Sequence, residues 1–151
     1  MNQLSKKWGK FTAKGSVEFE AKMTEMMEFV AAQLDNFLHK KEYRALVLLG
    51  GYGRGEGGVL IENDQEKPHN NFDLILFTTD LSQLRLGELQ DELDEEVAKI
   101  SREIGGIPID ISVKPASKLV HSSCLIIWYD MRFGHKTILG DDKFVPSLKN
   151  L

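Results

Sequence analysis

The chain of 151 residues is 42% hydrophobic and 28% charged, with a formal net charge of -4 at pH 7. This composition is that of an ordinary soluble globular protein, and no apolar run approaches the roughly 20 residues that a membrane span requires. The negative net charge gives no bulk attraction to nucleic acid, and the single Cys124 excludes both an intrachain disulfide and a cysteine-based zinc site. We therefore expect one cytoplasmic domain over 1–151, without a signal peptide and without contact to a membrane.

The chain begins with a basic stretch, KKWGKFTAK, that precedes the first amphipathic pattern. A terminal segment of this kind is more often solvated than bound to nucleic acid. We therefore predict a flexible arm over 1–15.

Two helices are predicted from the spacing of apolar residues. Such residues recur at three- and four-residue steps from Val17 to Leu38, and we assign the methionines among them to the core. The same spacing recurs from Ser82 to Ile104, where the acidic run DELDEE forms the solvated face and the glycine pair at 105–106 ends the helix.

Three strands are predicted around these helices. The aliphatic run from Arg44 to Leu49 is typical of a buried strand, NFDLILFTTD is a second strand, and IPIDISVKP, closed by Pro115, is a third. From Ser122 to Arg132 the pattern slightly favours a helix. This order of elements predicts an α/β or α+β domain in which helices flank a small mixed β-sheet.

A glycine-rich run, GGYGRGEGG, follows the first predicted strand directly and holds six glycines between Gly50 and Gly58. A Walker A loop would end in Gly-Lys-Ser or Gly-Lys-Thr, but no lysine follows these glycines before Lys67. A dinucleotide fingerprint would open a helix at once, and the residues that follow, VLIENDQEKPHNN, lack a helical pattern. The remaining phosphate-binding interpretation requires acidic residues on neighbouring strands.

Two aspartates meet this requirement. Asp73 and Asp110 each lie inside a predicted strand, between large aliphatic residues that we expect to be buried. Because desolvating an unpaired carboxylate is costly, each should be paired, hydrogen-bonded or bound to a cation. Their placement on adjacent strands indicates a shared magnesium ion. The alternative is that each one caps a turn or bonds to the backbone at a sheet end.

The same residues resemble the signature of the DNA polymerase β-like nucleotidyltransferase superfamily. In that superfamily a hydrophobic strand ends in Gly-Gly or Gly-Ser, a basic side chain follows after two residues, the next strand carries two acids one residue apart, and a later strand carries a third. LLGGYGRGE, NNFDLIL and IDISV are similar to these parts, over about Arg44 to Val113. The later segment YDMRFGHKTILGDD is similar to segments that follow the core in small bacterial members.

The resemblance implies a site for a nucleoside triphosphate, such as ATP, together with Mg²⁺ or Mn²⁺. It implies Asp73 and Asp110 as the second and third acids, which would hold the metal and activate an acceptor hydroxyl, and it places Arg54 near the phosphates. The implied nucleotide-binding residues are those of the glycine turn: Gly50, Gly51, Tyr52, Gly53 and Arg54. Tyr52 has two open roles, because it can stack on a base or cover the loop.

The first of the paired acids is replaced by Asn71, and an amide offers a cation one neutral oxygen but no charge. Two functions therefore stay open. The first is a nucleotidyltransferase that moves a nucleoside monophosphate from a triphosphate to an unidentified hydroxyl or protein acceptor. The second is a catalytically weakened, nucleotide-binding regulatory domain that acts through a protein partner or a second copy. The net charge does not indicate a nucleic-acid acceptor.

Other polar residues give weaker signals. The long spacing from Gly51 to Asn71 implies an inserted loop around 56–69, whose Glu56 and Glu62 could supply the missing charge but are expected to be solvated. The histidines lack metal-ligand spacing, and the serines beside Cys124 lack the pattern of a nucleophile. The histidines are His39, His69, His121 and His135, and the serines are Ser122 and Ser123.

Overall fold

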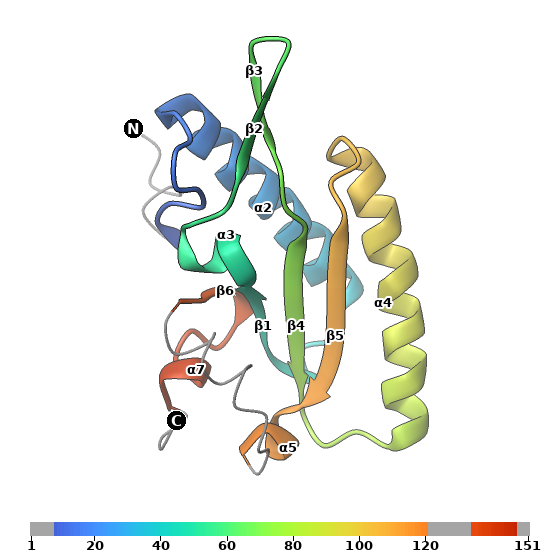
Figure 1. Cartoon of the computed structure of the whole chain (residues 1–151). Helices are drawn as coiled ribbons and strands as arrows, with labels where there is room; N and C mark the ends of the chain where they lie inside the picture. The colour runs from blue at the N-terminus through green and yellow to red at the C-terminus, as the bar shows by residue number, and fades with distance from the viewer. Residues whose placement is uncertain (1–7, 121–133, 148–151) are drawn as a thin grey trace.

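A four-stranded mixed β-sheet forms the centre of the computed structural model, which describes residues 8–120 and 134–147 (Figure 1). The strand order is β5-β4-β1-β6, and the strands are β1 (Tyr43–Leu49), β4 (Phe72–Thr78), β5 (Ile109–Pro115) and β6 (Lys136–Gly140). Strand β1 is antiparallel to both neighbours, whereas β4 and β5 are parallel and are connected through helix α4 (Gln83–Glu103). The predicted fold class, a small mixed sheet with flanking helices, is confirmed.

The two long helices, α2 (Val17–Phe37) and α4, begin and end within one residue of their predicted bounds. Each starts at a serine cap: the hydroxyl oxygens of Ser16 and Ser82 accept hydrogen bonds from backbone amides three residues later, both at 3.1 Å. The glycine pair at 105–106 follows α4 with φ angles of 92° and 85°, a left-handed conformation that ends a helix readily.

The two faces of the sheet bury different sets of side chains. On one face, alternate strand residues pack against the apolar stripes of α2 and α4, and the stripe of α2 includes the fully buried Met23 and Met27. The other face packs against α5 (Ala116–Val120) and α7 (Phe144–Ser147). This second cluster consists of Ala45, Val47, Leu49, Ile75, Phe77, Ala116, Phe144 and Val145. The prediction that the methionines belong to the core is confirmed.

The segment 56–69, expected to be an inserted loop, contains a β-hairpin made of β2 (Val59–Glu62) and β3 (Gln65–Pro68). Its turn residues Asn63 and Asp64 have φ angles of 53° and 60°, which these residue types tolerate better than most. The hairpin projects beyond the central sheet (Figure 1). Because it is largely solvated on both faces, its strands lack the alternation of apolar and polar residues that would have predicted them.

The described part of the N-terminal segment, residues 8–15, packs against the domain, so the prediction of a flexible arm is wrong for these residues. Phe11 is fully buried, and its carbonyl oxygen accepts a hydrogen bond from Gly57 N at 3.0 Å. Trp8 Nε1 donates to the carbonyl oxygen of Thr137 at 3.0 Å. The two aromatic side chains bury apolar surface, and this outweighs the solvation of the basic residues around them.

Strand β6 was not among the predicted elements, because its five residues are few and begin with a lysine. The helix favoured from Ser122 to Arg132 lies outside the described residues. Among the residues that the structure describes, no helix has the length and apolar character needed to cross a membrane.

Candidate functional site

The predicted acids Asp73 and Asp110 lie side by side at one end of the sheet. Leu49 of β1 pairs with Asp73 of β4, which in turn pairs with Asp110 of β5. Directly paired residues point to the same face, with Cβ atoms about 5 Å apart. The two carboxylates therefore share the face that α2 and α4 do not cover, next to the end of β1 where the glycine run begins.

Both aspartates are exposed, so the expectation that their carboxylates are desolvated is wrong. Their chain neighbours are buried as predicted, and these are Phe72, Leu74, Ile109 and Ile111. Because successive side chains of a strand point to opposite faces, buried neighbours direct each aspartate outward. A cation bound here would therefore offset the repulsion between two close like charges rather than a loss of hydration.

Asn71, the residue before the buried Phe72, contacts one of the two acids. Its Nδ2 atom donates a hydrogen bond to Asp110 Oδ2 at 2.9 Å. A neutral donor at this distance reduces the repulsion that Asp110 experiences from Asp73. Asn71 thus offsets part of the negative charge on Asp110.

Gly50 brings bare backbone against the Asp73 carboxylate. It is the first residue of the short helix α3 (Gly50–Arg54), and its φ of +70° lies in the left-handed region. A Cβ atom at this position would lie 2.8 Å from Asp73 Oδ2, closer than van der Waals contact allows. Glycine is therefore favoured at this position, and its backbone lies close to the Asp73 carboxylate.

Tyr52 covers the loop and is not placed to stack on a base. Its side chain is 1% exposed, and its ring lies edge-on to Phe72 with the ring centroids 5.3 Å apart. The hydroxyl donates to Gly58 O and accepts from Asn70 N, both at 3.0 Å. Burial raises the pKa of the Tyr52 phenol. This side chain fixes the base of the hairpin onto α3.

Gly53 is a packing residue whose carbonyl group is held by a buried lysine. Lys136 Nζ donates to Gly53 O at 3.1 Å and lies 5.0 Å from the centroid of the Phe11 ring. Burial lowers the pKa of Lys136 to about 8, although the carboxylate of Glu20 opposes the shift. Lys136 therefore holds the glycine turn in place through its hydrogen bond to the Gly53 carbonyl group. No motif or spacing in the sequence indicated this role.

Arg54 lies at the other end of α3 from Gly50 and is exposed. Its Nε atom is 3.6 Å from Glu56 Oε2, so Glu56 pairs with Arg54. A Cβ atom on Gly134, two residues before β6, would lie 2.6 Å from Arg54 Cγ. The arginine therefore stands toward the β6 edge, whereas Asp110 is on β5 at the opposite edge of the sheet.

Two carboxylates and one amide oxygen can supply only part of the ligand shell of a cation. Among residues 8–120 and 134–147, no group of three or more His, Cys, Asp or Glu side chains could hold a metal ion. Magnesium is often held by only one or two carboxylates, with waters and substrate phosphates completing its octahedron. The donor set of Asp73, Asp110 and Asn71 is compatible with Mg²⁺ or Mn²⁺ on those terms.

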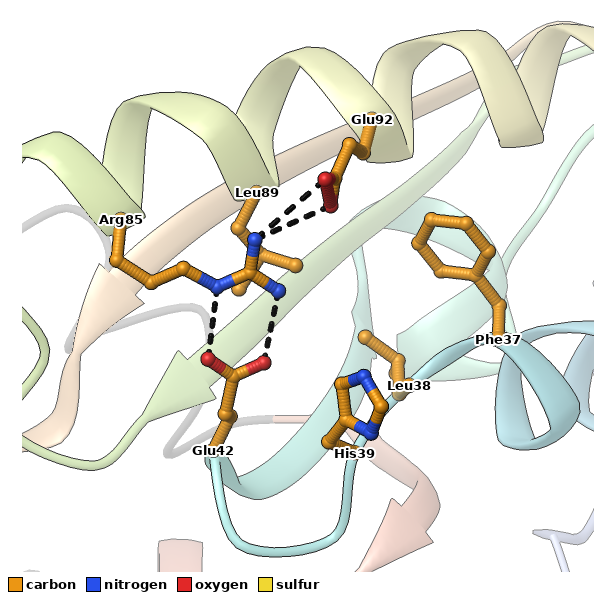
Figure 2. A pocket seen from close by; sticks show the side chains of 7 residues that line it. All are labelled: Phe37, Leu38, His39, Glu42, Arg85, Leu89 and Glu92. Atoms are coloured by element: carbon orange, nitrogen blue, oxygen red, sulfur yellow. Dashed lines mark hydrogen bonds and ion pairs between the residues drawn. The ribbon is translucent and has the colours of Figure 1, made fainter.

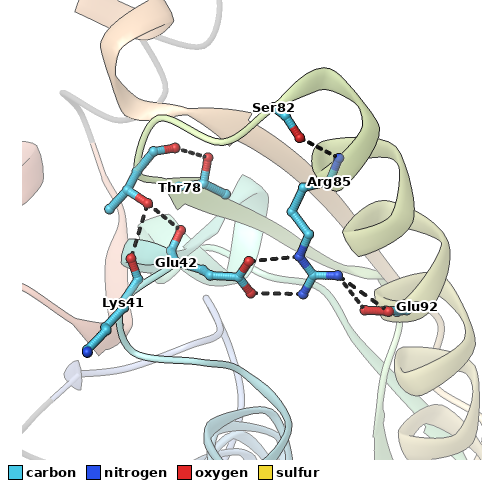
Figure 3. A network of polar contacts seen from close by, with 7 residues as sticks. Lys41, Glu42, Thr78, Ser82, Arg85 and Glu92 are labelled. Carbon is cyan, nitrogen blue, oxygen red and sulfur yellow. Dashed lines mark hydrogen bonds and ion pairs between the residues drawn. The ribbon is translucent and has the colours of Figure 1, made fainter.

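A separate cleft of about 600 Å³ lies near the beginning of β1 and is lined by Phe37, Leu38, His39, Glu42, Arg85, Leu89 and Glu92 (Figure 2). Arg85 Nε and Nη2 bond to Glu42 at 2.7 and 2.8 Å, and its Nη1 lies 3.3 Å from Glu92 Oε2. Figure 3 shows the bonds of Arg85 with Glu42 and Glu92. Thr79 Oγ1 donates to the carbonyl oxygens of Lys41 and Glu42, which extends the network to the end of β4. These paired charges join α4 to the turn before β1, so we assign them a structural role.

Comparison of the chain with protein-family models, with curated proteins and with solved structures finds no match.

Proposed function

We propose that the protein is a magnesium-dependent nucleotidyltransferase that transfers a nucleoside monophosphate from a triphosphate to a hydroxyl acceptor. The observation that carries the proposal is the row formed by Asp73 and Asp110, directly paired across β4 and β5, beside the bare backbone of Gly50. The resemblance to the DNA polymerase β-like superfamily supports it, because the acids of that superfamily occupy corresponding positions. Asn71, at the position of the missing acid, contacts Asp110.

The chemistry assigned to these residues is acid–base and electrostatic. A Mg²⁺ or Mn²⁺ ion held by Asp73 and Asp110 would neutralise charge on the triphosphate oxygens. The acceptor oxygen forms a bond to the α-phosphorus, and the bond from that phosphorus to the pyrophosphate oxygen breaks with its electron pair. One of the two carboxylates accepts the hydroxyl proton. Arg54 is assigned to the phosphates, which requires it to exchange Glu56 for the nucleotide.

The second candidate function is a nucleotide-binding regulatory domain with little or no transfer activity, acting through a protein partner or a second copy. The specific observation in its favour is that Asn71 already compensates Asp110, so the site needs a cation less than one with three carboxylates would. Under this alternative, nucleotide binds and the acceptor reaction is absent.

Calorimetry with magnesium and non-hydrolysable ATP and GTP analogues tests the proposal. Asp110→Asn should abolish magnesium-dependent binding, and Arg54→Ala should weaken it about tenfold or more, the loss of one charge-assisted hydrogen bond. Asp91→Asn, an exposed substitution on α4, is the charge-matched control and should bind as the unaltered protein does. Equal affinities for all four proteins, or no affinity in any, would overturn the site.

A further inference from the structure

The outer edge of β5 carries backbone groups that point away from the sheet. Strand β5 is the last strand in the order β5-β4-β1-β6. Phe72 N of β4 donates to Pro108 O at 3.0 Å, and Phe72 pairs with Ile109. In a parallel ladder this pairing directs the N–H and C=O groups of Ile109, and of every second residue after it, away from β4.

Gln90 of α4 bonds to part of this edge as the peptide group of a neighbouring strand would. Its Nε2 atom donates to Ile111 O at 2.9 Å, and its Oε1 atom accepts from Val113 N at 3.0 Å. One bond given and one received, two residues apart, is the arrangement that a strand forms with the next strand. The edge is therefore oriented for strand pairing. Gln90 occupies only the carbonyl oxygen of Ile111 and the amide of Val113.

Nearer the start of β5, the edge borders an open groove. The groove has a volume of about 500 Å³ and is lined by Asp94, Val97, Ala98 and Ser101 of α4 and by residues 108–112. Within the described part of the chain, no side chain is hydrogen-bonded to Ile109 O or Ile111 N. Short side chains at 94, 98 and 101 leave this space open, whereas the longer Gln90 spans it one helical turn earlier.

The register of the sheet relates this groove to the proposed active site. Leu49, Asp73 and Asp110 form one row across three strands, with their side chains on one face. A strand added beside β5 would extend the row, and its residue opposite Asp110 would point to the same face about 5 Å away. A hydroxyl side chain at that position would lie next to the Asp110 carboxylate. Asp94 and Asp110, both exposed, favour basic neighbours in the added strand.

We propose that this groove binds an extended, basic segment of polypeptide, which pairs with β5 as a fifth strand and carries the acceptor hydroxyl on a serine, threonine or tyrosine. The acceptor part rests on the proposed function, whereas the strand pairing does not. In the transfer, the side-chain oxygen bonds to the α-phosphorus, its proton passes to Asp110, and pyrophosphate leaves with the electron pair of the broken bond. The product is a nucleotidylated polypeptide.

Two variants of α4 test the strand pairing. Asp94 Oδ1 accepts a hydrogen bond from Gln90 Nε2 at 3.0 Å, and the amide oxygen that Asp94→Gln introduces can accept the same bond. The longer side chain, one turn after Gln90, can also reach Ile109 O and Ile111 N and close the groove. Glu88→Gln is the matched control, because it removes the same charge from an exposed position of α4 outside the groove. Neither substitution touches the glycine turn, so both variants should keep the triphosphate affinity of the unaltered protein.

The probe is a ten-residue peptide of alternating lysine, threonine and valine, added at millimolar concentration to the full chain labelled for NMR. We expect the peptide to slow hydrogen exchange of the Ile109 and Ile111 amides in the unaltered protein and in Glu88→Gln. The affinity of Asp94→Gln for the peptide should be about tenfold lower, which corresponds to the loss of two backbone hydrogen bonds. With labelled triphosphate and magnesium, label should pass to the threonine of the bound peptide.

The outcomes separate the two proposals. If the exchange of Ile109 and Ile111 does not change with peptide although triphosphate binds, the strand pairing is overturned and the proposed function stands. If the peptide protects these amides but no triphosphate binds, the proposed function fails and with it the acceptor assignment. Transfer of label to an oligonucleotide and not to the peptide would overturn the polypeptide acceptor directly.

Discussion

Replacing Asn71 by Asp converts a hydrogen bond into a repulsion, and the structure gives its size. Asn71 Nδ2 lies 2.9 Å from Asp110 Oδ2, and two unit charges at that separation repel by about 1.4 kcal/mol at the permittivity of water, which suits exposed groups. Loss of the hydrogen bond to a charged acceptor adds about 1 kcal/mol. Without divalent cations, Asn71→Asp should therefore lower the free energy of unfolding by about 2 kcal/mol.

Magnesium should recover more than half of this loss, because the added carboxylate strengthens the cation site. A ligand at about ten times its Kd stabilises the folded state by about 1.4 kcal/mol. Urea denaturation with and without magnesium measures both effects, and Asn71→Ala is the control that removes the hydrogen bond without adding charge. If Asn71→Asp and Asn71→Ala unfold at the same urea concentration in chelator, and magnesium shifts neither, the reasoning is refuted.

Three further predictions follow from single residues. Gly50→Ala places a methyl group 2.8 Å from a carboxylate oxygen at a φ of +70°. It should therefore lower the free energy of unfolding, measured by urea denaturation, by about 1–2 kcal/mol. Gly87→Ala in α4, where a Cβ atom would have nothing within 4 Å, should raise the free energy of unfolding by up to about 1 kcal/mol. Because burial lowers the pKa of Lys136 from 10.5 to about 8, the unfolded chain binds more protons between these pH values. The stability of the unaltered protein should therefore rise with pH across this window relative to that of Lys136→Met. The hydrogen bond from Arg85 lowers the pKa of Glu42 below 4.5. The stabilisation that the ionised Glu42 gives to the fold is therefore present above pH 4.5 and is lost as the pH falls further. Glu42→Gln should reduce this loss in acid unfolding followed by circular dichroism.

Each of these predictions has a clear contrary result. Equal stability of Gly50→Ala and the unaltered protein would show that the turn tolerates a side chain. Parallel pH profiles for Lys136→Met and the unaltered protein would mean that the lysine titrates at its ordinary pKa in the fold. An unchanged acid transition in Glu42→Gln would mean that this carboxylate gains nothing from Arg85.

The parts of the fold with a strong local signal could be predicted from the sequence. Both long helices have a continuous apolar stripe and a serine cap, and the strands containing Asp73 and Asp110 have buried aliphatic neighbours. The hairpin could not be predicted, because its exposed strands lack an apolar face: Ile61, for example, is 71% exposed. The packing of the N-terminal segment depends on contacts with residues far along the chain, which no local pattern encodes.

The closeness of Asp73 and Asp110 could be predicted from the sequence, but their exposure could not. Alternation along the strands places the two acids on one face, but the assumption that buried neighbours imply a buried carboxylate failed, because those neighbours point the other way. The role of Tyr52 could not be predicted from the sequence. A tyrosine within a glycine run suits a base or a core equally well, and only the bonds of its hydroxyl to the hairpin distinguish the two. Lys136 is a long-range partner of Gly53 and gives no signal in its own segment.

The position of β6 also has a consequence for the order of folding. Strand β6 pairs with β1 through residues as far apart as Ala45 and Gly140, whereas β4, α4 and β5 follow one another from Phe72 to Pro115. Contacts between distant residues carry a larger loop-closure cost and form later on average than local ones. During synthesis, β4 and β5 can bring Asp73 and Asp110 together before β6 exists. The ammonium group that supports Gly53 from β6 arrives afterwards, so we expect the acidic half of the site to form before its glycine turn is fixed.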